Sequence, residues 1–110
     1  MKLLMAIVQD EDSSKVLENL NKSNFGATKL SSTGGFLKAG RTTFIIGTED
    51  ERVDEAIQVI KKSSMSRKQI IDTSSSSHLF LEGAGMTYPV EVTVGGATIF
   101  ILNVERIEKV

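Results

Sequence analysis

Cysteine and tryptophan are absent from this 110-residue sequence, and histidine, proline and tyrosine each occur once. The lack of cysteine excludes disulfides, thiolate metal sites and a cysteine nucleophile. Because His78 is the single histidine, one chain cannot form a Ser-His-Asp triad or a metal site with two imidazole ligands. His78 follows four serines and is either a solvated loop residue or a contact residue. We therefore expect no enzymatic activity, no metal and no cofactor.

Long apolar runs and an excess of charge of one sign are also missing. The apolar run at residues 3–8 is too short for a membrane span or a signal peptide, so we expect a cytoplasmic protein. Thirteen Lys+Arg and fourteen Asp+Glu give a formal net charge of -1, which disfavours nucleic-acid polymers as partners. The length predicts one domain, residues 1–110, with a modest core that association with other copies would enlarge.

Apolar and β-branched runs predict strands at residues 3–8, 27–33 and 42–46. Helical spacing of apolar residues predicts two helices. The first begins at Asp12 or Ser13, which can cap it. The second follows a capping box formed by Thr48 and Glu51, and its last turns carry Lys61 and Lys62. The acidic residues that open both helices, 10–12 and 49–51, are explained by the helix dipole.

The C-terminal third predicts a β-hairpin, because alternating valines at 90, 92 and 94 precede Gly95-Gly96 and an apolar run at residues 97–104. Residues 65–87 read as a long loop. The order of elements predicts an α+β fold of the ferredoxin-like, split βαβ type with an added C-terminal β-hairpin. Both helices would cover one face of the sheet. We expect the other face to present Phe44 and Ile46 and to be covered by self-association.

A glycine-rich loop is the strongest candidate for a binding site. Gly34 and Gly35 free the backbone to turn N–H groups toward an anion, and Phe36 could stack on a purine. Lys38 and Arg41 could neutralise phosphate. Near the end of the first helix, the amide of Asn24 matches an adenine edge, and Thr28 lies close by in the sequence. Each residue also has a purely structural explanation, so the pattern alone indicates a small nucleotide or anion binder.

Five segments of this sequence closely resemble the PII-like cyclic-di-AMP receptor family of Gram-positive bacteria. They are Ala6–Asp10, Asn24–Leu30, Thr33–Gly40, Thr42–Phe44 and Tyr88–Thr98. The resemblance implies a homotrimer that binds cyclic di-AMP in clefts between its subunits and has no enzymatic activity. It also implies that residues 34–41 correspond to the T-loop of PII proteins and residues 65–87 to their B-loop.

The resemblance also assigns roles to individual residues. Asn24 and Thr28 would contact one adenine, and Gly47 would leave room for the ligand. Phe100 would come from the neighbouring subunit. The remaining contacts, which would cradle the base and phosphate, fall to Gly35, Phe36 and Leu37.

Two positions depart from the family pattern. Gly26 stands where the family usually has an arginine that meets a phosphate, and Arg41 stands where it often has asparagine. Our hypothesis is that Arg41 lies opposite Gly26 and supplies the missing charge.

Three classes of function remain open at this stage. In a signalling receptor, ligand binding would order the two loops and alter a surface that an unknown downstream protein recognises. An RNA-binding ferredoxin-like module would need exposed aromatics and a basic surface, which this composition lacks. An enzyme acting on nucleotides or phosphoesters would need catalytic groups from several subunits.

Overall fold

The computed structural model describes residues 1–30, 40–72 and 89–110. In chain order its elements are β1 (Lys2–Gln9), α1 (Asp10–Lys22), β2 (Ala27–Leu30), β3 (Arg41–Thr48), the 3-10 turn η1 (Asp50–Arg52), α2 (Val53–Ser64), β4 (Arg67–Asp72), β5 (Pro89–Val94) and β6 (Ala97–Asn103). The strands predicted at 3–8 and 42–46 are confirmed and run further at both ends. Of the strand predicted at 27–33, residues 27–30 form β2 and the rest lies outside the described residues.

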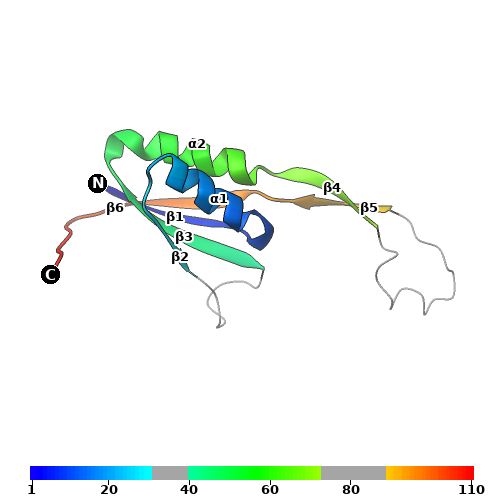
Figure 1. The fold of residues 1–110 in the computed structure, drawn as a ribbon, viewed down its shortest axis with the longest axis horizontal. Helices are drawn as coiled ribbons and strands as arrows, with labels where there is room; N and C mark the ends of the chain where they lie inside the picture. The colour runs from blue at the N-terminus through cyan, green and yellow to red at the C-terminus, as the bar shows by residue number, and fades with distance from the viewer. Residues whose placement is uncertain (31–39, 73–88) are drawn as a thin grey trace.

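Four strands form one antiparallel sheet in the order β2-β3-β1-β6. The first two helices of the chain lie on the same side of this sheet (Figure 1). The units β1-α1-β2 and β3-α2-β6 interleave their strands in this order, which is the split βαβ arrangement. The described residues therefore form a mixed α+β fold, with one four-stranded sheet and two helices, which is consistent with the predicted ferredoxin-like core.

The core lies between the sheet and the helices, and the alternation of side chains along each strand decides which residues enter it. In β1, Leu4, Ala6 and Val8 are fully buried, whereas their neighbours are only partly buried. The helices contribute Val16 and Leu20 from α1, and Ala56 and Ile60 from α2. Burial of this apolar surface is the main favourable term in the stability of the fold.

The expectation that Phe44 and Ile46 face away from the helices is wrong. Both are fully buried. Their strand partners in β1 are Ala6 and Leu4, whose side chains point into the same core. The apolar residues of the helix-free face are instead Leu3, Met5 and Ile7 of β1, Leu30 of β2, Ile45 of β3, and Phe100 and Leu102 of β6. The apolar runs located the strands correctly but did not establish which alternate residues face the helices.

Both predicted helix starts need correction. The first helix begins at Asp10, so Asp12 and Ser13 lie inside its first turn and are buried. Before the second helix, η1 intervenes, and no side chain caps either η1 or α2, so the predicted capping box at Thr48 does not form. The lysines predicted in the last turn of α2 are confirmed.

The predicted C-terminal hairpin is also wrong, because β5 and β6 do not pair with each other. β5 pairs with β4 in a separate two-stranded sheet, which we call the arm, and β6 pairs with β1. Gly95 and Gly96 have positive φ values of 83° and 90°, but the chain runs on from β5 into β6 instead of reversing there (Figure 1). β4 also occupies part of the segment predicted as a loop at 65–87.

Truncating an aromatic residue of the core should reduce the free energy of unfolding far more than truncating a residue of the arm. Phe44→Ala is expected to lower the free energy of unfolding by about 3–5 kcal/mol, because it leaves a cavity under the helices. Ile70→Ala in the arm, where the side chain is 69% exposed, should change it by less than about 0.5 kcal/mol. Urea titrations at equal protein concentration give both values. Equal losses in the two variants would contradict the assignment of the core.

Candidate functional site

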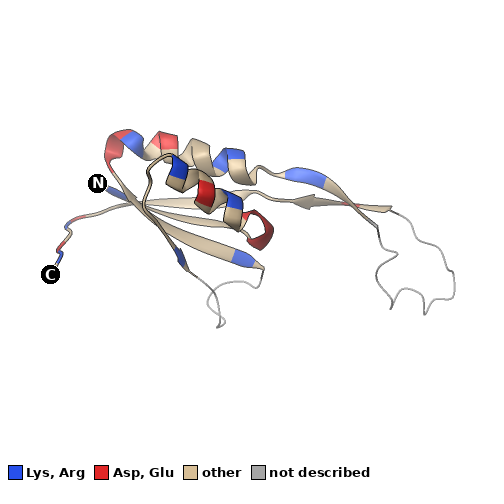
Figure 2. Ribbon diagram, in the orientation of Figure 1, with Lys and Arg blue, Asp and Glu red and all other residues tan. Residues whose placement is uncertain are grey.

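Four predicted binding residues lie on the helix-free face of the sheet: Thr28 on β2, Arg41 and Gly47 on β3, and Phe100 on β6. Direct strand partners place Thr28, Ile45, Met5 and Phe100 in one row that crosses all four strands. Partners in an antiparallel sheet point to the same side, so all four side chains belong to this face. Charged residues concentrate on the helices, the turns and the arm, while the strands of the sheet are largely uncharged (Figure 2).

Thr28 and Phe100 lie at opposite edges of this row. Three strand spacings of about 4.8 Å separate β2 from β6, so their backbones are about 14 Å apart. Both side chains are exposed, and Phe100 is 52% accessible. Two side chains this far apart cannot close on the same base within one chain. If both belong to one site, a second chain must supply one of them.

Asn24 occupies a constrained turn between α1 and β2. Its φ of 63° is left-handed, a conformation that asparagine tolerates better than most residues. The next residue, Phe25, is buried, and its N–H donates to the Leu20 carbonyl at 2.9 Å. Arg52 lies 4.0 Å above the Phe25 ring and donates to the Ser23 carbonyl at 2.7 Å. The exposed Asn24 amide is therefore held on a turn that is fixed from both sides.

Two glycines leave space at the end of the face near this turn. Gly47 pairs with Leu3, and Gly26 directly precedes Ala27, whose strand partner is Ile46. A Cβ built on either glycine would meet no atom of the described residues within 4 Å. That Gly47 leaves room for the ligand stays a prediction. Thr28 and the two glycines lie at this end of the face, and the Asn24 turn directly precedes them in the chain; we call these four residues the open corner.

The hypothesis that Arg41 lies opposite Gly26 is wrong within one chain. Arg41 begins β3 and pairs with Gln9, whereas Gly26 is adjacent to the Gly47 end of the same strand. Six residues of strand, about 20 Å, separate Arg41 from Gly47. Arg41 lies instead directly after Gly40, where the chain leaves the glycine-rich segment. It remains a candidate for contact with a phosphate held by that segment.

Thr43 is a further polar residue of this face that the sequence analysis missed. It pairs with Ile7 and Leu30, and its side chain is buried. Its Oγ1 makes no hydrogen bond within the structure as described. The alternation that places Gly47 and Ile45 on this face also includes Thr43, so the strand period could have identified it.

Three of the predicted ligand residues, Gly35, Phe36 and Leu37, lie outside the described residues, as does His78. No group of three or more potential metal ligands occurs in residues 1–30, 40–72 and 89–110. In the same ranges, no helix has both the length and the apolar character that crossing a membrane requires.

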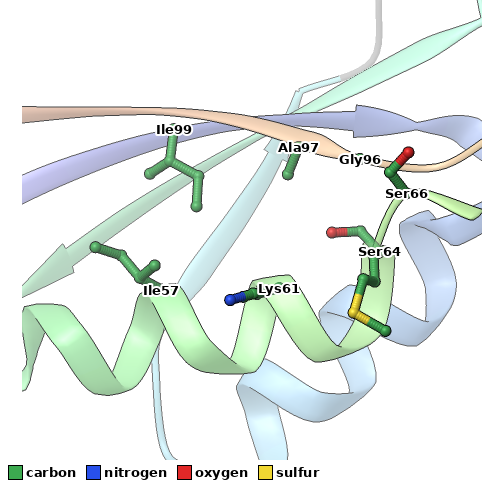
Figure 3. Close-up of a pocket in the computed structure, with 8 residues that line it drawn as sticks. Ile57, Lys61, Ser64, Ser66, Gly96, Ala97 and Ile99 are labelled. Atoms are coloured by element: carbon green, nitrogen blue, oxygen red, sulfur yellow. The ribbon is translucent and has the colours of Figure 1, made fainter.

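A cavity of about 380 Å³ lies on the opposite side of the sheet, between α2 and β6 (Figure 3). Its largely apolar wall includes Ile57 and Ile99, with Lys61 at the side. Among the predicted ligand residues that the structure describes, Asn24, Thr28, Arg41, Gly47 and Phe100, none lines it. This cavity and the open corner are therefore separate features of the molecule.

The fold is a ferredoxin-like α+β arrangement in which the helix-free face of the sheet ends in the open corner. The chain belongs to the cyclic-di-AMP receptor family, which matches residues 1–110. The resemblance inferred from the sequence segments is thereby confirmed.

A solved structure supports the same architecture. The crystal structure of a functionally unknown protein from Pediococcus pentosaceus ATCC 25745 is similar to this chain with a TM-score of 0.76 and 42% sequence identity. The match covers 99% of this chain and 96% of that one. The fold is therefore shared over nearly the full length of both proteins.

Adjacent threonines on β3 test the account of Thr43. Thr43→Val should leave the free energy of unfolding unchanged or raise it by about 1 kcal/mol, because no hydrogen bond is lost. Thr42→Val removes a hydroxyl that donates to Asp10 Oδ1 and should lower it by about 1 kcal/mol. Urea unfolding of the ligand-free variants distinguishes the two. An equal loss in both would show that the Thr43 hydroxyl has a partner.

Proposed function

We propose that this protein is a cyclic-di-AMP receptor that binds its ligand in clefts between three copies of the chain and signals by ordering the segments around the cleft. The observation that carries the proposal is the placement of Thr28 and Phe100 at opposite edges of one sheet face. Family membership supplies the ligand class. A cleft that contains both residues requires β2 of one chain to lie beside β6 of the next.

The helix-free face supports association between copies. Its outer strands expose Leu30, Phe100 and Leu102 by 40–52%, and its central strands add Met5 and Ile45. An apolar sheet face of this kind loses free energy when it is covered, and closed rotational symmetry covers every such face equally. The proposed trimer therefore buries this face and creates one cleft at each boundary.

The open corner provides groups suited to a purine. The Asn24 amide carries both a donor and an acceptor, which match the adenine edge, and the Thr28 hydroxyl adds a third polar group. Gly26 and Gly47 leave room for the ring to approach the backbone. Phe100 from the neighbouring chain supplies an aromatic surface for stacking. We assign Gly35, Phe36 and Leu37 to the base and phosphate on the strength of the family resemblance alone.

Complementation between variants tests whether the cleft is shared. Thr28→Glu replaces the small hydroxyl beside the adenine with a larger, charged side chain, and Phe100→Ala removes the stacking surface; each should weaken cyclic-di-AMP binding at least tenfold. In trimers mixed at equal amounts, about one cleft in four receives both native residues, because each cleft takes them from different chains. Calorimetric titration should then show a class of sites with native affinity.

The control for this experiment is each variant titrated alone after the same unfolding and refolding used to mix them. If the mixture binds as the plain average of the two parents, Thr28 and Phe100 do not meet across a subunit boundary, and the proposed cleft is wrong.

The charge of Arg41 should contribute to phosphate binding. Arg41→Ala is expected to weaken cyclic-di-AMP binding by about 10–100-fold, the effect of losing one charge-assisted hydrogen bond. Lys29→Ala is the matched control, because Lys29 is an exposed cation on neighbouring β2 and pairs with Phe44, whose side chain faces the helices. Calorimetry gives both dissociation constants. An unchanged constant for Arg41→Ala would remove Arg41 from the site.

A further inference from the structure

Four consecutive residues, Gln9 to Asp12, lie where β1 meets α1 and make hydrogen bonds or ion pairs to two other parts of the chain. We call them the junction. One part is the exit of the glycine-rich segment at Gly40 and Thr42, and the other is the root of the arm at Arg67 and Gly95. The sequence analysis attributed the acidic residues of the junction to the helix dipole alone. Their specific contacts show that the dipole is not a sufficient explanation.

Asp10 makes the contacts to the glycine-rich segment. Its N–H donates to the Gly40 carbonyl at 3.0 Å, and its carboxylate accepts a hydrogen bond from the Thr42 hydroxyl. The Ser13 hydroxyl donates to the Asp10 carbonyl at 2.8 Å and so ties the same residue to the first turn of α1. Any shift of the backbone at Gly40 and Thr42 must therefore move Asp10 or break these bonds.

Asp12 makes the main contact to the arm. Its side chain is only 7% exposed, and its Oδ1 lies 2.9 Å from Arg67 Nη2 while its Oδ2 lies 3.4 Å from Nη1. Glu11 lies 4.0 Å from the same guanidinium. The hydrogen bond to Asp12 raises the pKa of Arg67 above its ordinary value. A carboxylate this buried depends on its partner, because an unpaired buried charge is costly.

Gln9 provides a second contact to the arm, where its Oε1 accepts a hydrogen bond from the Gly95 N–H at 2.8 Å. Packing at this point is tight. A Cβ on Gly95 would lie 2.5 Å from the Met65 carbonyl oxygen and 2.6 Å from Arg67 Nη1, and the φ of 83° also favours glycine. Both strands of the arm are thus attached to the junction: β4 through Arg67, and β5 through Gly95, the residue that follows it.

We propose that the junction couples the glycine-rich segment to the arm, with Arg67 as the residue that positions the arm. This inference rests on the proposed function, because it takes the segment that ends at Gly40 and Arg41 as the place where ligand binding acts. Binding that shifts Gly40 and Thr42 displaces Asp10, and the adjacent Asp12 transmits the displacement to Arg67. The arm then changes its position or its stability relative to the sheet.

The first test uses the ligand-free protein and a double-mutant cycle. Thr42→Val and Arg67→Gln remove contacts to different junction residues, and no contact joins Thr42 to Arg67 in the structure as described. Hydrogen exchange of arm amides in Arg67–Asp72 and Pro89–Val94 measures the opening of the arm. The coupling account expects the double variant to deviate at least twofold from the product of the single effects. Multiplicative effects would overturn it.

The second test adds cyclic di-AMP. In the native protein the ligand should change arm exchange at least fivefold, and in Arg67→Gln most of this response should be lost although the ligand still binds. Reciprocity requires the ligand affinity of the open arm state and that of the closed arm state to differ by the same factor. Arg67→Lys keeps the charge but not the paired hydrogen bonds, so it should restore the response only in part. A full ligand response in Arg67→Gln would overturn the inference.

Lys68→Gln is the matched control for both tests. Lys68 is the next residue of β4, and it forms an exposed ion pair with Glu91 across the arm at 3.3 Å without reaching the junction. The arm response of this variant should equal that of the native protein. If the native protein binds no cyclic di-AMP but the ligand-free cycle still shows coupling, the proposed function fails and the junction stands as a mechanical link.

Discussion

The alternation of side chains along β1 is the constraint on which the rest of the structure depends. Leu4, Ala6 and Val8 bind the sheet to its helices, and this commits the intervening residues to the opposite face. The same period then places Ile45 and Gly47 of β3 and Phe100 of β6 on that face. A shift of one residue in register would exchange the two faces, so the core and the candidate site are specified together.

Local patterns predicted much of the fold, whereas strand partners and facing directions could not be read from them. The apolar run of β1 and the spacing of α2 located these elements because each signal is contained within a few residues. The Gly95-Gly96 pair correctly marked a break between two strands, but the chain does not reverse there and the two strands pair with other partners. The pairing of β6 with β1 depends on residues about a hundred positions apart, and no local pattern records it.

The candidate site divides in a similar way. Asn24 and Thr28 were singled out by their position and chemistry, and Gly47 and Phe100 by family resemblance. The sheet then showed that Thr28 and Phe100 are too far apart to contact one base within a single chain. Arg41 was placed beside Gly26 by reasoning along the sequence, but the length of β3 separates them. Thr43 was missed although the strand period includes it, whereas the junction contacts were missed because a carboxylate or amide acquires its partner only when distant segments pack together.

Native mass spectrometry of the protein with cyclic di-AMP tests the central claim most directly, because it reports the number of chains and of ligands in one particle. The account predicts a particle of three chains that carries up to three ligand molecules, with ligand absent from single chains. Ligand bound to an isolated chain, or a trimer that takes up none, would contradict it.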